Sequence, residues 1–427
     1  MALFGKYKIN KNYYLIVGQI LLLFAIGANI AWLNPGREVA KTNPKIPILW
    51  QYSGDASVDF LSGAFFPEYY KVDPMRISRP TFPFLAKIFG ELAGLIALPL
   101  GKISVLLKTI IGFSLLKIIY FSCGAILLYE LVKKWLGEMT AMLSVTVVFF
   151  HPHSIRWVAA FSTPEAQFIT PIIIIFMFFD LMKNYSHKKN LVYSIIAGVL
   201  FLIKENYAVC LALLIFGIFK KKFSAVGMSV VGLLIPQLTW LLTLKLYRIP
   251  YFNLHTEQYG QGVWIFTDLF FRHPIEIIQT IMLSLKDWLV MYAEYFTIFL
   301  VLALLAFAYK HIKEKFNRPV CQFMGLFLLF SWLQVFAVKE YDSSFRVSDL
   351  AFIIFPLGIY TIVQLLGKYG NERQTKRILN TGIALYIILS LISFINLPWV
   401  HPYDQKNVLE YKQDRIDKFD QGIIYQK

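Results

Sequence analysis

Charged residues are scarce in this sequence of 427 residues: they make up 16% of it, whereas soluble domains contain about 25%. Hydrophobic residues reach 57%. This balance excludes an ordinary soluble protein of this length, because its polar groups could not cover the apolar surface of the folded chain. The sequence therefore predicts an all-α polytopic membrane protein, in which lipid surrounds most of the chain.

Cysteine is also rare. The three cysteines, Cys123, Cys210 and Cys321, lie far apart within apolar stretches and form neither a CxxC pair nor a metal-ligand spacing. We interpret them as small buried hydrophobic residues, which give no indication of the redox compartment. Internal repeats, low-complexity tracts and a separate soluble domain are not visible in the sequence either.

Acidic residues are outnumbered, with 26 Asp and Glu against 42 Lys and Arg, which gives a net charge of +16. Much of the surplus lies in short gaps between apolar runs, which argues against recognition of nucleic acid. The six basic segments are 1–12, 132–138, 183–190, 220–222, 310–318 and 367–377. The positive-inside rule places all six, including the N-terminus, in the cytoplasm and the intervening segments outside.

The apolar runs between these segments predict the membrane helices. Nine of them are 13–33, 104–131, 139–157, 164–182, 223–246, 288–309, 320–338, 349–366 and 378–397. Two shorter runs, 191–203 and 206–219, are below the roughly 17 residues that a full span needs. We expect them to form a helical hairpin with Lys204-Glu205 at its tip, which brings the total to about eleven membrane helices.

These assignments give a single membrane domain, 1–397, and a short external tail, 398–427. Two longer external segments, 34–103 and 247–287, interrupt the domain. The apolar run 84–101 belongs to the first of them, because counting it as a span would put every later basic loop on the wrong side. We predict that this run forms external amphipathic or re-entrant helices.

The first external segment contains acids followed by arginines. Asp55 and Asp59 are four residues apart, so a helix would present both on one face. Arg76 and Arg79 follow, and arginine side chains suit phosphate oxygens in geometry and charge. This order at the membrane surface predicts a site for chemistry on a lipid phosphate. The alternative is a solvated loop in which Asp73 simply pairs with Arg76.

Further ionisable and aromatic residues from distant segments are predicted on the same side. They are Glu165, Lys204, Glu205, His255, Tyr259 and Arg346. Ionisable groups at membrane depth usually face a bundle interior or a wet cavity. The loop 247–287, which carries two of these residues, suits either sugar stacking or anchoring at the interface, and we favour anchoring. Within the run 104–131, Lys108 is expected to extend to the interface and Lys117 to pair internally.

Several short patterns are shared with a known superfamily. They are Gly54-Asp55-Ala56, the strip Asp73-Pro74-x-Arg76-x-x-Arg79-Pro80 leading into Pro83, and the later Thr163-Pro164-Glu165, Lys204-Glu205 and Arg346 before Phe355-Pro356. In these features the chain resembles the GT-C membrane glycosyltransferases. The resemblance covers most of the chain as architecture and is patchy as sequence. It is nearest to bacterial members that build cell-surface glycopolymers, which implies a plasma (inner) membrane with the active site and C-terminus on the periplasmic side.

The resemblance implies an inverting hexosyl- or pentosyltransferase. The donor would be a sugar linked to polyprenyl phosphate, and the acceptor a lipid-linked or surface glycan. By this resemblance Asp55 is the general base with Asp59 as second candidate, Arg76, Arg79, Lys204 and Arg346 hold the lipid phosphate, and Glu165, Glu205, His255 and Tyr259 line the acceptor site or cavity. The chain lacks the paired acids or DxD pattern of some members, so no metal ligand is assigned and dependence on Mg or Mn stays open.

Two other functions are open at this point. A surface-polysaccharide polymerase or ligase would be expected to place its large polar loop late in the chain, whereas here the distinctive loop comes first. A transporter or flippase of lipid-linked saccharides would be expected to show interrupted helices at matched positions in its two halves. The sequence shows one interrupted pair, 191–203 and 206–219, without a partner.

Overall fold

The computed structural model describes most of the helical core. The described residues are 10–33, 61–71, 77–97, 105–152, 154–155, 169–203, 218, 222–251, 263–296, 304–305, 309, 329, 332–333, 336 and 351–396. Regular structure in these residues is helical throughout, and no strand occurs among them. The predicted all-α class is therefore confirmed.

Among the described residues, three helices are long and apolar enough to cross a membrane, as judged by length and composition. They are α4 (Val105–Leu136), α10 (Phe223–Leu246) and α17 (Glu372–Asn396). Large apolar side chains on their outer faces are exposed, for example Leu242 on α10 and Leu389 on α17. Lipid is the solvent that such faces require. The structure thus indicates membrane association, and the total of about eleven membrane helices stays a prediction.

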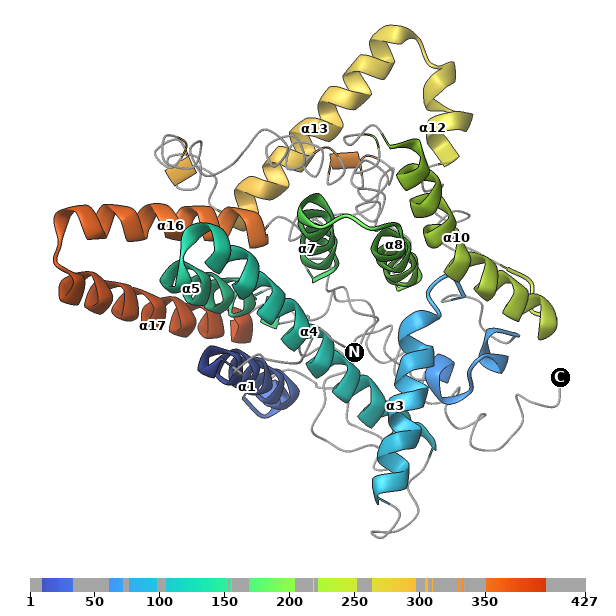
Figure 1. Cartoon of the computed structure of the whole chain (residues 1–427), viewed down its shortest axis with the longest axis horizontal. Coiled ribbons are helices and arrows are strands. Elements are labelled where there is room, and N and C mark those ends of the chain that lie inside the picture. Colours follow the sequence, from blue (N-terminus) through green and yellow to red (C-terminus); the bar gives the residue numbers. More distant parts are fainter. Residues whose placement is uncertain are drawn as a thin grey trace.

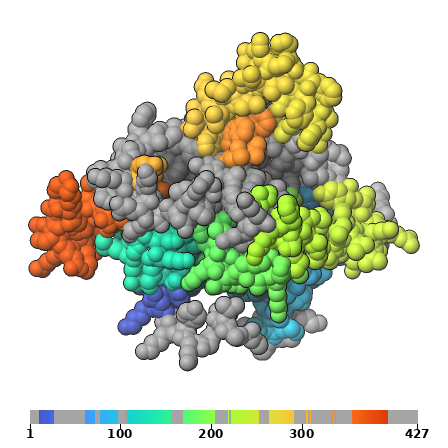
Figure 2. Space-filling model, turned by 45° about the horizontal axis from the view of Figure 1, so that its top comes forward, coloured from blue at the N-terminus to red at the C-terminus, as the bar shows by residue number. Residues whose placement is uncertain are grey.

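The other described helices are α1 (Lys11–Leu33), η1 (Glu68–Lys71), α3 (Thr81–Ala97), α5 (Glu138–Phe149), α7 (Ile169–Lys183), α8 (His187–Phe201), α12 (Val263–Thr267), η5 (Leu269–Phe271), α13 (Pro274–Phe296) and α16 (Ala351–Tyr369). They include five that pack directly on α4, namely α1, α3, α5, α7 and α16. Figure 1 shows α4 running diagonally through the molecule, with the α16–α17 pair on one flank and α10 on the other. In the space-filling view, the α16–α17 pair (red) and α13 (yellow) extend from the central body (Figure 2).

Several helix boundaries differ from those predicted. α13 runs as one helix through the predicted boundary at 287/288 between an amphipathic stretch and a span, and it contains no Gly or internal Pro that could break it. α4 continues past residue 131 through Lys133 and Lys134. It is separated from α5 by Gly137, whose φ of 93° is in the region that favours glycine. α5 then ends at Phe149, eight residues short of the predicted boundary.

α3 and α4 form a close antiparallel pair. A Cβ atom added to Gly112 would overlap the carbonyl oxygen of Ala86, and one added to Gly90 would overlap that of Lys108. Small residues allow two helix backbones to approach in this way. The Nζ of Lys108 lies 2.9 Å from Glu91 Oε2, and the extension of this side chain to the interface stays a prediction. The outer face of α3 carries exposed apolar residues such as Phe84, and the external or re-entrant position of this segment stays a prediction.

α8 and α10 lie side by side and run in the same direction. Near their beginnings, Asn190 Nδ2 donates to the carbonyl of Ala225 at 2.9 Å. Farther along, Gln237 Nε2 donates to the carbonyl of Gly198 at 3.0 Å. Because the contacts advance together along both helices, the two N-termini share one end of the bundle and the two C-termini share the other.

Pairs of contacts also give the directions of α7 and α1. α7 runs parallel to α4, because Tyr120 bonds to Thr170 and Trp135 packs on Phe179, with ring centroids 4.6 Å apart. α1 runs parallel to α5, because contacts near the start of both helices are followed by a bond from Gln19 to Thr146. These directions agree with the order of inward and outward spans that the sequence predicts.

Four of the six basic segments meet at one end of the bundle. Asn12 bonds to Glu138, which joins the start of α1 to the α4–α5 turn. The Trp135–Phe179 contact joins that turn to the end of α7. Lys222 lies over the ring of Tyr185, which joins the start of α10 to the α7–α8 turn. We name this the basic end. The structure supports the predicted grouping of these segments, and their location in the cytoplasm stays a prediction.

Candidate functional site

Arg79 is the one predicted site residue in the described part of the chain. Asp55, Asp59, Arg76, Glu165, Lys204, Glu205, His255, Tyr259 and Arg346 lie outside the described residues. The structure does describe the segments that adjoin several of them. Residues 61–71 follow Asp59, residues 77–81 follow Arg76, and α8 with its last turn ends at Ile203, directly before Lys204.

Residues 77–81, which include the last residues of the strip and the first residue of α3, are held against the C-terminal end of α8. The main-chain N–H of Thr81 donates to the carbonyl of Leu202 at 3.5 Å, and its hydroxyl donates to the carbonyl of Val199 at 3.2 Å. Carbonyls at the end of a helix have few partners within it. The Val199 carbonyl also accepts the N–H of Leu202 at 3.1 Å, so the Thr81 hydroxyl is its second donor. The segments that carry Arg79 and Lys204, two predicted phosphate ligands, therefore meet here. We name this the strip end.

α10 holds the strip from another side through Trp240. Its indole Nε1 donates to the carbonyl of Ile77 at 2.7 Å, and the ring is buried. Phe66 stacks on this ring at a centroid distance of 5.6 Å, and Tyr70 meets it edge-on at 5.7 Å. The strip is thus fixed by hydrogen bonds to its backbone and by an aromatic wall.

Residues 61–71 bring the chain that follows the two predicted acids to the same place. A Cβ atom added to Gly63 would lie 2.8 Å from the methyl group of Thr109 on α4. Lys87 Nζ on α3 donates to the carbonyl of Phe66 at 2.8 Å. This segment is therefore packed on α3, α4 and α10 together, two residues after Asp59.

Two cationic side chains are buried in this part of the molecule. Arg79 is 4% exposed and Lys117 is 1% exposed, and both interact with other groups of the protein. Lys117 lies between Phe113 and Tyr120 on one face of α4, and both of these rings contact Phe82, two positions from the strip's Pro80. Both cations therefore lie in or near the segment that carries the predicted phosphate ligands.

Lys117 was not among the predicted phosphate ligands. The sequence predicts that Lys117 pairs internally, and no local pattern connects it with the strip. The available signal is its position: Lys117 lies in the apolar stretch between Lys108 and Glu130, and ionisable residues at membrane depth usually face a bundle interior or a wet cavity. Its relation to Phe82 depends on the packing of α3 against α4, which the sequence alone does not specify.

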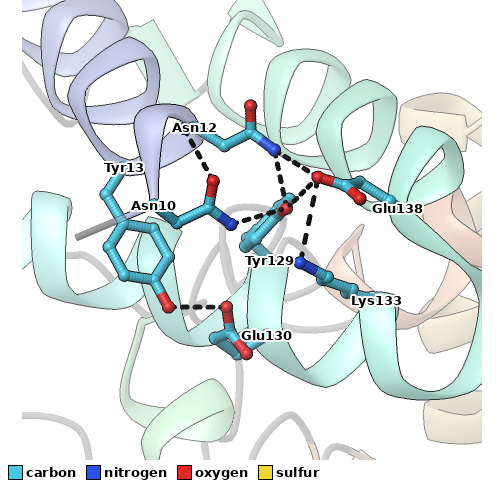
Figure 3. Close-up of polar contacts among 7 residues, drawn as sticks. All are labelled: Asn10, Asn12, Tyr13, Tyr129, Glu130, Lys133 and Glu138. Carbon is cyan, nitrogen blue, oxygen red and sulfur yellow. Dashed lines mark hydrogen bonds and ion pairs between the residues drawn. The ribbon is translucent and has the colours of Figure 1, made fainter. Parts of the chain in front are cut away.

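A second polar cluster lies at the basic end and differs in kind. It joins Asn10, Asn12, Tyr13, Tyr129, Glu130, Lys133 and Glu138 (Figure 3). Asn12 Nδ2 donates to the hydroxyl of Tyr129 at 2.8 Å and to Oε1 of Glu138 at 2.6 Å, and Tyr129 donates to the same carboxylate oxygen at 3.0 Å. These groups bind one another across three helices, so we interpret the cluster as a clasp that holds α1 to the α4–α5 turn.

Neither a metal site among the described residues nor similarity to a known protein indicates what this site does. Within the described ranges, no group of three or more His, Cys, Asp or Glu side chains could hold a metal ion. Comparison of the chain with protein-family models, with curated proteins and with solved structures finds no match in any of the three. The resemblance to the GT-C superfamily therefore rests on the sequence patterns alone.

Proposed function

We propose that this protein is an inverting membrane glycosyltransferase of the GT-C type. It transfers a sugar from a polyprenyl-phosphate donor to a lipid-linked or surface glycan acceptor, on the external face of a bacterial plasma membrane. The observation that carries the proposal is the meeting of the strip with the end of α8, because it brings the segments of Arg79 and Lys204 together. We assign the active site to this strip end.

The proposed chemistry needs a base and a set of cations. Asp55, with Asp59 as second candidate, accepts the proton of the acceptor hydroxyl, whose oxygen attacks the anomeric carbon from the face opposite the phosphate. The bond between that carbon and the phosphate oxygen breaks, and the electron pair remains on the phosphate. Arg76, Arg79 and Lys204 stabilise the charge that develops there.

Other residues complete the proposed site. Arg346 joins the phosphate ligands, and Lys117 is added to them because it is buried on the face of α4 that contacts Phe82. Glu165, Glu205, His255 and Tyr259 are assigned to the acceptor site or cavity, as the resemblance implies.

The aromatic wall supports a lipid-linked donor. Phe66 contacts Phe84 on α3 at a centroid distance of 5.3 Å, and Phe84 is 45% exposed on the outer, apolar face of that helix. Aromatic and apolar side chains thus continue from Trp240 beside the strip to the lipid-facing surface. An isoprenoid chain bound along this path would bury apolar surface while its phosphate reached the cations.

The first test uses a strain that lacks the gene and carries wild-type protein, Asp55→Asn or Arg79→Gln at equal membrane abundance. Mass spectrometry of surface glycans and lipid-linked intermediates is expected to show that only wild type restores one defined sugar, whose lipid-phosphate donor otherwise accumulates. Lys376→Gln on the exposed start of α17 is the matched control and should restore the sugar fully.

Other outcomes would redirect the assignment. Complete saccharide units that accumulate without being joined would indicate a polymerase or ligase. Units that accumulate without reaching the outer face would indicate a transporter or flippase. Full restoration by Asp55→Asn would remove the base assignment.

A further inference from the structure

Exposed lysines gather where α7 ends and where α8 and α10 begin. Lys183, Lys188 and Lys222 are all exposed. The sequence 180–190 contains a single acid, Asp180, and its carboxylate already accepts an ion pair from Lys189 Nζ at 2.8 Å and a hydrogen bond from Tyr193 at 2.6 Å. The three exposed lysines therefore form a surplus of positive charge that no acid of this segment balances. We name them the lysine patch.

The lysine patch is held together by an aromatic side chain. Lys222 Nζ lies 4.7 Å from the ring centre of Tyr185, and the Tyr185 hydroxyl lies 3.1 Å from Nδ1 of His187, next to Lys188. Burial raises the pKa of Tyr185, so its phenol is neutral near pH 7. The start of α10 is thereby fixed beside the α7–α8 turn.

The position of Lys222 sets the depth of the lysine patch. α10 begins at the next residue, Phe223, which is 91% exposed, and the helix continues with an exposed apolar face that includes Val230 and Leu234. Val192 on α8 is exposed as well. A lysine at the border of a lipid-facing helix lies at the level of the lipid headgroups.

We propose that the lysine patch binds the phosphate of an anionic phospholipid. The lysine ammonium groups attract the headgroup, and the exposed apolar residues at the starts of α8 and α10 contact the acyl chains. A soluble anion would use the charge but not the apolar surface, which is why a lipid is the expected occupant. This site is at the basic end, and it is separate from the proposed transfer reaction.

The test compares lipids on the full-length protein in a neutral detergent. Native mass spectrometry measures binding of phosphatidylglycerol and of phosphatidylcholine with the same acyl chains. We expect phosphatidylglycerol to bind more tightly, and Lys188→Gln and Lys222→Gln each to reduce its affinity about fivefold, because each lysine near an anionic headgroup contributes roughly that much. Lys245→Gln, an exposed lysine near the other end of α10, is the matched control and should leave the affinity unchanged.

Three results would overturn the proposal. Equal binding of the two lipids would show that the charge is not recognised. An equal loss in Lys245→Gln would show that net charge rather than the lysine patch is responsible. Displacement of phosphatidylglycerol by glycerol phosphate at the same concentration would show a soluble-anion site. Melting temperatures without added lipid verify that the variants are folded.

Discussion

Asn12, Tyr129 and Glu138 at the basic end bind one another, whereas Thr81 and Trp240 at the strip end bind main-chain carbonyls. In the first arrangement side chains join helices. In the second, side chains fix the course of a connecting segment that carries a predicted ligand. One end of the bundle is therefore held together by contacts between helices, and the other by contacts to a segment that connects them.

The two ends also differ in the solvent available to their charges. The side chain of Glu138 is 56% exposed, whereas Arg79 and Lys117 are almost completely buried. Electrostatic interactions are screened by water at the surface and are much stronger in the interior. A charge at the basic end should therefore contribute modestly to stability, whereas a cation at the strip end should act strongly on a bound phosphate.

Glycine is required for different physical reasons at Gly137 and at Gly112. A Cβ atom added to Gly137 at the basic end would meet nothing within 4 Å, and the φ of 93° is the reason for glycine there. Gly112, on the α3–α4 contact, has helical geometry and no space, because Ala86 and Gly90 on α3 approach its backbone. At Gly137 the backbone conformation requires glycine, whereas at Gly112 the lack of space requires it.

The largest expected effect comes from filling the α3–α4 contact. Gly112→Val should destabilise the protein by about 3 kcal/mol or more, because overpacking at a backbone contact forces the helices apart. Gly227→Ala on α10 is the control, since a Cβ there meets nothing within 4 Å. Size-exclusion profiles and melting curves in detergent measure both. A stable Gly112→Val protein would contradict the close α3–α4 pairing.

Arg79→Gln is expected to have the next largest effect, and on activity rather than folding. Loss of one cation that stabilises a developing phosphate charge should reduce transfer on the order of 100-fold. Release of polyprenyl phosphate by purified protein measures it, once the glycan analysis has identified the sugar. Unchanged release from a well-folded Arg79→Gln protein would remove this residue from the proposed site.

The sequence predicted those features that depend on local composition. The bounds of α10 agree with the predicted run 223–246, because the apolar residues are continuous and Lys222 precedes them. The meeting of four basic segments at one end also follows from charge distribution alone. The predicted membrane boundary at 287/288 falls inside α13, because an amphipathic stretch and an apolar stretch can join into one helix.

The sequence predicts less of the candidate site than of the fold. The spacing of the strip predicts Arg79 as a ligand, but it does not predict that this side chain is buried. The bond from Trp240 to Ile77 connects residues 163 positions apart, and no local pattern predicts such a contact. Lys117 illustrates the same limit, since its relevance depends on which face of α4 meets α3.

Trp240→Phe removes one hydrogen bond at the strip end and keeps an aromatic ring in the same place. Phenylalanine can still stack on Phe66, but the buried carbonyl of Ile77 loses its indole donor. We expect a loss of about 2 kcal/mol in stability, with a reduction of transfer because the strip is less firmly placed. A fall in stability without any change in transfer would show that the strip does not need this bond in order to act.

Glu138→Ala at the basic end is expected to have the smallest effect. It removes the acceptor shared by Asn12 and Tyr129, and the partner of Lys133 at 3.8 Å. Because the carboxylate is largely exposed, water replaces much of what is lost, and stability should fall by about 1 kcal/mol. Transfer should be unchanged, since the clasp lies at the basic end and the proposed donor site lies at the strip end. Melting curves and polyprenyl phosphate release, measured together with Arg79→Gln, test this directly. If Glu138→Ala impaired transfer as much as Arg79→Gln at equal stability, the two ends would be functionally coupled and the division between them would be wrong.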